Sequence, residues 1–172
     1  MKVSKDITGI VVLYDTTIEI IDCLKRLKDI KFIIVNNGKC NKKIINEILK
    51  FENISKYFKP KKNLGFGRAN NFAFKYVNTK YTLLINADIK TSIKDIEELV
   101  NTFIKYPNTG ISVPILVDKN NDNIDFLECL PEVASKFAKQ SNVEKKLMSG
   151  DTCINFCWGA IMLLNNKIIN KT

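Results

Sequence analysis

The residues best suited to chemistry stand at the end of one apolar run. Tyr81–Ile85 reads YTLLI, as expected of a strand buried on both faces, and Asn86-Ala87-Asp88 follows at once. Ligands of open α/β sheets bind at the carboxyl ends of the strands. A carboxylate there, two residues after an amide, can hold a hard metal ion that in turn holds phosphates. Asn and Asp also end strands and form turns, so these residues alone leave a purely structural role open.

A glycine loop precedes this run. Residues 63–71 read NLGFGRANN, which places Gly65 and Gly67 at the expected start of a helix. Glycines at a helix N-terminus let an anion approach the backbone, and Arg68 beside them could pair with a diphosphate. The loop lacks the third glycine of a dinucleotide fingerprint, and the chain has no G-K-[ST] of a P-loop. Three lysines that could help to attract phosphate come just before it: Lys59, Lys61 and Lys62.

Two further polar pairs follow predicted strands, Tyr14-Asp15 and Asn36-Asn37. The carboxyl ends of parallel strands meet at one rim of a sheet, so these pairs are expected near Asp88. Asp15, Asn36 or Asn37 could hydrogen-bond a pyrimidine base or ribose, because Asn offers both a donor and an acceptor to a uracil edge. Taken singly, each of these residues is better explained as a turn former.

The apolar periodicity predicts alternating strands and helices. Thr16 or Thr17 would cap the first helix, and Ser92 with Asp95 forms a capping box for the fourth. The inner face of that fourth helix is predicted to carry Ile93, Ile96, Val100, Phe103 and Ile104. Strands are predicted at residues 7–14, 31–35, 54–58, 81–85, 111–117 and 153–164. The first predicted helix follows Thr16 or Thr17 and runs to about residue 28, and the third runs from the glycine loop to about residue 77. The other helices are predicted at residues 42–51, 93–106 and 131–146. The alternation implies a single α/β domain over residues 1–172, with a mainly parallel sheet flanked by helices.

The composition excludes several kinds of protein. With 172 residues, 45% of them hydrophobic, the chain is expected to be one globular domain with a real core. No apolar run approaches the ~20 residues that span a bilayer, and the N-terminal run is too short for a signal peptide, so a cytoplasmic protein is expected. Histidine is absent, which removes Ser-His and Cys-His catalysis and His ligation to metals. Five cysteines without a C-x-x-C predict neither a disulfide framework nor a zinc site.

The net charge of +9 comes almost entirely from lysine. A basic surface can attract nucleotide phosphates, nucleic acid or anionic lipid. An AT-rich genome would also enrich Lys, Ile and Asn together, and this compositional explanation is preferred. Nucleic-acid readers usually interleave Arg and aromatic residues in their basic patch. This chain does not, so no nucleic-acid partner is expected.

Five segments together resemble glycosyltransferase family 2, and within it the rhamnosyltransferase-like members. They are Tyr14-Asp15, V-N-N-G at 35–38, N-L-G-F-G-R-A-N-N at 63–71, L-L-I-N-A-D at 83–88 and W-G-A-I-M-L-L at 158–164. The likeness covers about residues 7–118 and 156–170. It implies a GT-A, Rossmann-like fold and inverting transfer of a sugar from a UDP- or dTDP-sugar to a glycan or lipid-linked acceptor in bacterial cell-surface polysaccharide synthesis. A peripheral position at the inner face of the membrane and a homodimer stay open.

The resemblance also implies roles for particular residues. The family's D-x-D motif maps onto Asn86-Ala87-Asp88, which makes Asp88, with Asn86, the implied contact for Mg²⁺ or Mn²⁺. The family's nucleoside-binding Asp maps onto Asn36, a departure that weakens the expected base recognition. The implied nucleotide- and donor-binding residues are Tyr14, Asp15, Asn36, Asn37, Asn63, Gly65, Phe66, Gly67, Arg68, Asn71, Asn86, Ala87, Asp88, Trp158, Gly159 and Ala160.

A second departure concerns the general base. The family continues past the segment matching residues 158–164 to an acidic motif that supplies it, whereas no Asp or Glu follows Asp151 here. Inverting transfer needs a base to take the proton of the acceptor hydroxyl. We therefore expect a donor-binding part without its acceptor side, which transfers sugar weakly or not at all and has no identified catalytic base. Five carboxylates could substitute: Asp118, Asp122, Asp125, Glu128 and Asp151.

Two other functions stay open. A nucleotidyltransferase with a similar α/β core would be expected to carry a basic glycine-rich loop directly after the first strand, where this chain has Tyr14-Asp15-Thr16-Thr17. A binding or scaffold subunit would keep the fold and the nucleotide-sugar site but lack transfer, as the missing carboxylate would allow.

Overall fold

One mainly parallel sheet organises the fold. The computed structural model describes residues 3–15, 18–120, 122 and 159–169. Six strands are hydrogen-bonded in the order β3-β2-β1-β4-β6-β5. The first four are parallel, and β6 is antiparallel to both β4 and β5, which confirms the predicted sheet type. The strands are β1 Ile7–Leu13, β2 Lys31–Asn36, β3 Ile54–Phe58, β4 Tyr81–Ile85, β5 Ile111–Ser112 and β6 Ile161–Asn165.

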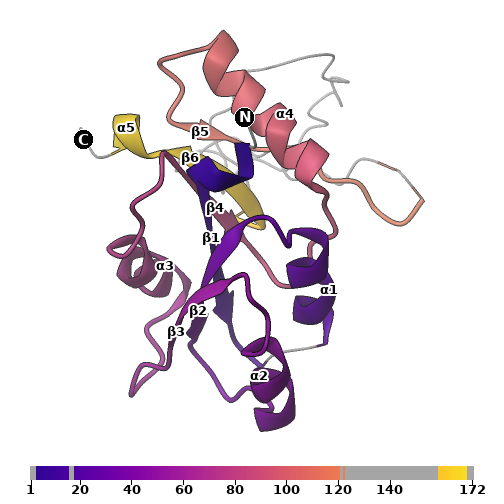
Figure 1. The fold of residues 1–172 in the computed structure, drawn as a ribbon, viewed down its shortest axis with the longest axis vertical. Helices are drawn as coiled ribbons and strands as arrows, with labels where there is room; N and C mark the ends of the chain where they lie inside the picture. The colour runs from indigo at the N-terminus through magenta and orange to yellow at the C-terminus, as the bar shows by residue number, and fades with distance from the viewer. Residues whose placement is uncertain (1–2, 16–17, 121, 123–158, 170–172) are drawn as a thin grey trace, which may run out of the picture. The chain divides into compact units, whose positions relative to one another are not determined.

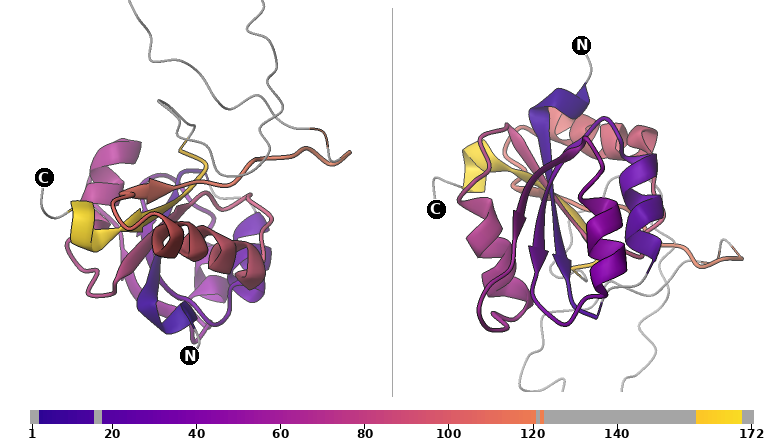
Figure 2. Two further views of the ribbon diagram at one scale, coloured as in Figure 1. Left: turned by 90° about the horizontal axis from the view of Figure 1, so that it is seen from above. Right: turned by 60° about the horizontal axis from the view of Figure 1, so that its bottom comes forward.

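Helices cover both faces of the sheet. Figures 1 and 2 show α1 and α2 on one side of the sheet and α3 on the other. The helix α3 packs on β1 and β2, while α4 packs on β5 and β6. The helices are η1 Val3–Asp6, α1 Glu19–Arg26, α2 Lys42–Ile48, α3 Phe66–Phe74, α4 Ile93–Lys105 and α5 Asn166–Ile169.

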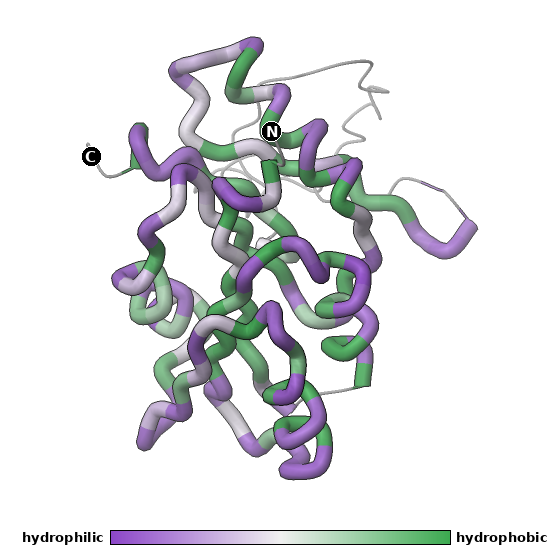
Figure 3. Tube along the Cα trace, in the orientation of Figure 1, coloured by the Kyte–Doolittle hydropathy of each residue, from purple (hydrophilic) through white to green (hydrophobic). Residues whose placement is uncertain are grey.

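The core beneath α3 depends on small residues. Ala69 and Ala73 are fully buried and lie against Ile10, Ile33 and Leu84 of three neighbouring strands. Alanine lets the helix axis approach the sheet closely, so the short α3 is fixed tightly on β1 and β2. Figure 3 shows the strands as mainly hydrophobic and the surrounding turns as mainly hydrophilic, as a sheet covered on both faces requires.

The helix α4 begins as the sequence predicts. The Ser92 hydroxyl accepts from the Asp95 N–H at 3.3 Å, and the Ser92 N–H donates to Asp95 Oδ2 at 2.8 Å. Burial raises the pKa of the Asp95 carboxyl, but hydrogen bonds from Ser92 and Thr91 outweigh it and hold that pKa below its ordinary value. The predicted inner face is wrong at one position, because Ile104 is 70% exposed and Leu99 is buried instead.

Several predicted boundaries differ from the structure. The strand predicted at 111–117 ends at Ser112, because Pro114 cannot donate to a ladder, and β5 lies at the edge of the sheet. The N-cap of α1 is Ile18, which makes no side-chain cap hydrogen bond, while Thr16 and Thr17 lie outside the described residues. The last strand begins at Ile161, and residues 153–158 and the helix predicted at 131–146 also lie outside the described ranges.

The order of the strands creates one topological switch point. From β1 the chain proceeds to β2 and β3 on one side, and β4 then pairs with the other edge of β1. The connections after β1 and after β4 therefore diverge, which leaves a crevice at the carboxyl ends of these two strands. Open α/β sheets bind ligands at this place.

The chain divides into two compact units, Met1–Pro114 with Gly159–Thr172, and Ile115–Trp158. The sheet and all the elements named above belong to the first unit. No helix in the described part of the chain has the length and apolar character needed to cross a membrane.

Candidate functional site

A cavity of about 300 Å³ lies at the switch point. One wall comes from the end of β1 and the other from the end of β4, so the two polar motifs predicted to share a rim do meet. Asp15 and Asp88 are both exposed on this rim. The residues that line the cavity are Val12, Leu13, Tyr14, Asp15, Asn86, Ala87 and Asp88.

The β4 wall is anchored by the chain that leads into β6. The Asn86 N–H donates to the carbonyl oxygen of Ala160 at 2.9 Å, and the Ile89 N–H donates back to the Asn86 oxygen at 3.3 Å. Gly159 lies against the Phe66 ring, since a Cβ at position 159 would be 3.3 Å from Phe66 Cε1. The start of α3, the segment 159–160 and the residues after β4 are thus brought together, although they are distant in sequence.

The β1 wall has an unusual backbone. Asp15 has a φ of 48°, in the left-handed region that Asp tolerates better than most residues. Tyr14 is 63% exposed, and its ring lies beside Gly38, where a Cβ would come within 2.7 Å of Tyr14 Cδ2. The Asn37 N–H donates to the Leu13 oxygen at 2.8 Å, so the ends of β1 and β2 are joined at this rim.

Asn36 is buried at the end of β2. Its Nδ2 donates to the Tyr57 hydroxyl at 2.9 Å, and its Oδ1 accepts from the Gly38 N–H at 3.4 Å. The sequence reasoning did not include Tyr57 in the site, and no motif signals it, because the pairing depends on the register of β2 against β3.

Asn37 contacts the glycine loop. Its Nδ2 donates to Asn63 Oδ1 at 2.8 Å, and its Oδ1 accepts from the Leu64 N–H at the same distance. The Gly65 N–H also donates to Asn63 Oδ1, at 2.7 Å. Gly65 itself is the N-cap of α3, with φ 74° and ψ 166°, a region that is essentially restricted to glycine.

Other predicted residues stand apart from the cavity lining. Gly67 lies inside α3, and a Cβ there would meet nothing within 4 Å. Arg68 and Asn71 are exposed on the same helix, and neither lines the cavity. Trp158 lies outside the described residues.

The rim offers oxygen ligands for a divalent cation. Asp88 and Asp15 supply carboxylates and Asn86 an amide oxygen, the donors that Mg²⁺ and Mn²⁺ prefer. No group of three or more acidic, Cys or His side chains that could hold a metal gathers within the described ranges. The residues fit an ion held by one or two carboxylates, with substrate phosphates completing its coordination.

A nucleophilic role for the nearby thiol does not fit. Cys23 on α1 is buried, and burial together with the negative charges of Asp22 and Asp88 raises its pKa to about 12, against a smaller opposing effect of Arg26. The thiol is therefore protonated at neutral pH.

The carboxylates suggested as substitute bases are only partly described. Asp118 lies in a turn, where its Oδ1 accepts from the Asn120 and Asp122 N–H groups at 2.7 and 3.0 Å. Asp125, Glu128 and Asp151 lie outside the described residues.

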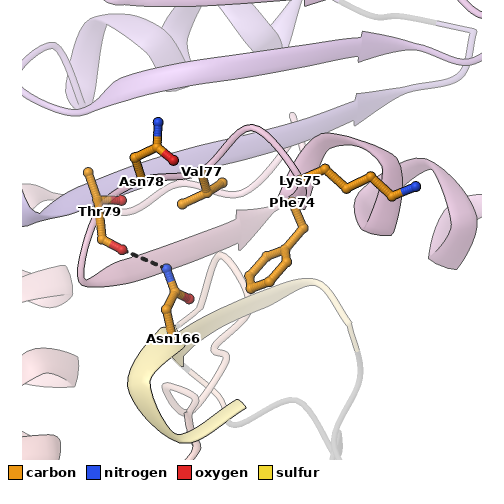
Figure 4. Close-up of a pocket in the computed structure, with 6 residues that line it drawn as sticks. All are labelled: Phe74, Lys75, Val77, Asn78, Thr79 and Asn166. Carbon is orange, nitrogen blue, oxygen red and sulfur yellow. Dashed lines mark hydrogen bonds between the residues drawn. The ribbon is translucent and has the colours of Figure 1, made fainter. Parts of the chain in front are cut away.

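A larger cavity, of about 400 Å³, lies at the opposite end of β4 (Figure 4). Asn166 points toward Thr79 there and donates to its carbonyl oxygen at 2.8 Å. None of the residues that line this cavity is a carboxylate, and it lies at the amino end of β4, away from the switch point. The smaller cavity is therefore the candidate site.

Comparison of the sequence with known protein families identifies the family of this chain. A family model described as Glycosyl transferase family 2 matches residues 11–170. A comparison with curated protein sequences finds no match.

Comparison with solved structures identifies proteins that have a similar fold. The chain is similar to the mannosyltransferase PcManGT from Pyrobaculum calidifontis in complex with GDP-Man and Mn²⁺, at 10% identity and a TM-score of 0.60. It is also similar to S. aureus TarS 1-349, at 14% identity and a TM-score of 0.55. Each match covers 96% of this chain but only 46% and 48% of those proteins, so the chain spans about half their length.

A third similar structure is a CMP:2-keto-3-deoxy-manno-octonic acid synthetase complexed with CTP, at 9% identity and a TM-score of 0.53. That match covers 96% of this chain and 76% of the synthetase. At identities this low, the structural likeness shows a shared fold alone, and it confirms the predicted GT-A-type arrangement.

Proposed function

The chain belongs to glycosyl transferase family 2, and on this premise we propose that it binds a nucleotide-diphosphate sugar in the cavity at the switch point. In the whole protein, the bound donor would pass its sugar to an acceptor hydroxyl with inversion. One observation carries the proposal: Asp15 and Asp88, from the ends of β1 and β4, line one cavity where an α/β sheet binds its ligand.

Each part of the rim has a proposed task. Asp88, with Asn86, would hold Mn²⁺ or Mg²⁺, which when bound neutralises charge on the diphosphate leaving group. The backbone at Gly65 and the positive end of α3 would face the diphosphate. Asp15, exposed in the cavity, would contact the base or ribose, while the buried Asn36, bonded to Tyr57, would shape the rim. Gly159 and Ala160, beside Asn86, would border the donor sugar.

The finer assignments extend this proposal. We infer a pyrimidine donor, UDP- or dTDP-linked, from the family resemblance of the sequence; the Asn36 amide, bonded to Tyr57 and Gly38, adds no separate support. Three further proposals rest on family likeness alone. They are a glycan or lipid-linked acceptor, a role in cell-surface polysaccharide synthesis and a position at the inner face of the membrane.

Calorimetry with nucleotide sugars tests the proposal. UDP-, dTDP- and GDP-sugars are titrated into the chain with Mn²⁺ and again with EDTA, and a selective response identifies the donor class. Asp88→Ala should raise the metal-dependent Kd by roughly 10- to 100-fold, because a charged ligand is lost while the exposed position leaves the fold intact. Equal affinity with Mn²⁺ and with EDTA would show that the metal role is wrong.

Asp6→Ala provides the matched control. Asp6 is an acidic residue that directly precedes β1, at the opposite end of the strand from Asp15. Its replacement removes the same charge from the chain, so a loss of affinity seen with Asp88→Ala alone cannot be explained by net charge. Loss with both variants would contradict the assignment of the site.

A further inference from the structure

The glycine loop has no cap of its own. Gly65 is the N-cap of α3, and a glycine has no side chain with which to bond the first turn. The loop is held instead from β2, 26 residues earlier in the chain, by the Asn37 amide. Asn37 is 6% exposed, so this amide lies within the protein and not on the open rim.

Two backbone donors fix the orientation of both amides. The atom of Asn37 that faces the Leu64 N–H at 2.8 Å must be oxygen, so its Nδ2 faces Asn63. The atom of Asn63 that receives both this Nδ2 and the Gly65 N–H must also be oxygen. Asn37 therefore both donates and accepts, whereas the Oδ1 of Asn63 only accepts in this pair.

We infer that Asn37 is a positioning residue for the donor, which holds the loop 63–65 and the start of α3 in the conformation that faces the diphosphate. This inference rests on the proposed function, and it replaces the sequence-based expectation that Asn37 contacts the base or ribose. Both hydrogen-bonding ends of its side chain are engaged within the protein, and the Nδ2 lies also 3.4 Å from the Gly65 oxygen. Gly65 in turn carries a positive φ, which glycine adopts about as readily as a negative one, so the backbone alone does not fix the loop and the contacts of Asn37 are needed to hold it.

The test is a double-mutant cycle on nucleotide-sugar affinity. Asn37→Ala and Asn63→Ala should each raise the Kd on the order of tenfold, because the binding-competent loop becomes a minor conformer. The double variant should lose less than the sum of the two single losses, since both variants remove the Asn37–Asn63 bond and each removes in addition only one backbone contact, to Leu64 or to Gly65. Additive losses would mean that Asn37 acts on the nucleotide independently and would overturn the inference. Asn63 is exposed, so Asn63→Ala should fold and its Kd can be measured even if Asn37→Ala folds poorly.

Asparagine-to-aspartate changes separate donor from acceptor. Asn63→Asp keeps the oxygen that accepts from Asn37 and Gly65, so amide exchange at Gly65 should stay slow. Asn37→Asp keeps the oxygen that accepts from the Leu64 N–H but cannot donate to Asn63 Oδ1, and its second carboxylate oxygen then repels that oxygen. The loop should therefore loosen, so that the Gly65 amide exchanges faster and the Kd rises. Equal exchange in both variants would contradict the proposed polarity of the pair.

Asn166→Ala is the matched control. Asn166 is 7% exposed, accepts from the Thr82 hydroxyl at 2.9 Å and donates to Thr79, at the far end of β4 (Figure 4). It should lower the melting temperature much as Asn37→Ala does but leave the Kd unchanged. A wild-type chain that binds no nucleotide sugar overturns the proposed function and this inference with it. A wild-type chain that binds, with an Asn37→Ala variant that binds equally well, overturns the inference alone.

Discussion

Gly65 offers the sharpest test of how the glycine loop works. Its φ of 74° and ψ of 166° lie in a region that glycine alone occupies readily. A Cβ at this position would meet nothing within 4 Å, so the cost of Gly65→Ala is conformational and not steric. That cost is about 1–3 kcal/mol, which for a domain of this size lowers the melting temperature by roughly 2–12 °C.

Gly67 supplies the comparison within the same loop. It lies inside α3 without a positive φ, and a Cβ there would also meet open space. Gly67→Ala should therefore keep or raise the melting temperature, because alanine is favoured over glycine in a helix by about 0.5–1 kcal/mol. If Gly67 has a role, it is close approach of the ligand to the backbone.

Thermal unfolding and donor titration together separate a conformational role of the glycine from close approach of the ligand to its backbone. Gly65→Ala should lose stability and affinity together, whereas Gly67→Ala should keep its stability and lose affinity only where the diphosphate approaches that part of the backbone. An unchanged melting temperature for Gly65→Ala would refute the conformational argument. An unchanged Kd for Gly67→Ala would show that the diphosphate does not approach position 67.

Three further predictions concern stability. Gly9→Ala should destabilise the fold by about 1–3 kcal/mol, because overpacking a core carries this cost. Its Cβ would lie 2.2 Å from the ring of the fully buried Phe32, whereas Gly110→Ala, whose nearest contact would be 3.6 Å, should be tolerated in the same thermal melts. Ser92→Ala should cost about 1 kcal/mol by removing the cap of α4. Because the folded pKa of Asp95 is lowered, its stabilising effect relative to Asp95→Asn should be present above about pH 4 and fade as the pH falls below it; a difference in melting temperature that does not change with pH would contradict this.

Much of the scaffold could be predicted from the sequence because β1, β2 and β4 are buried on both faces. The limits of β4 are as predicted, since it is an uninterrupted run of apolar or β-branched residues that ends at Asn86. The limits of β3 are also as predicted, although its residues are exposed or half-buried, because a proline-containing loop follows it. The meeting of Tyr14-Asp15 with Asn86-Asp88 followed from one physical rule, that parallel strands end at one rim.

Side-chain direction could not be predicted in the same way. Asn36 and Asn37 are adjacent at a strand end, and nothing in their order indicates that one meets Tyr57 and the other Asn63. These partners depend on the register of β2 against β3 and on the path of the glycine loop. The contact of Gly159 with Phe66 depends likewise on β6 running antiparallel beside β4.

Burial separates two roles among the polar residues of the rim. Asn36 and Asn37 are 3% and 6% exposed and bonded within the protein, so they shape the rim before any ligand arrives. Asp15 and Asp88 are exposed and line the cavity. Two carboxylates repel a diphosphate brought between them, and this repulsion is relieved when a divalent cation lies between the like charges. The charge of the rim itself therefore supports the proposed cation, and we expect nucleotide affinity to respond to Mn²⁺ far more than to monovalent salt at equal ionic strength.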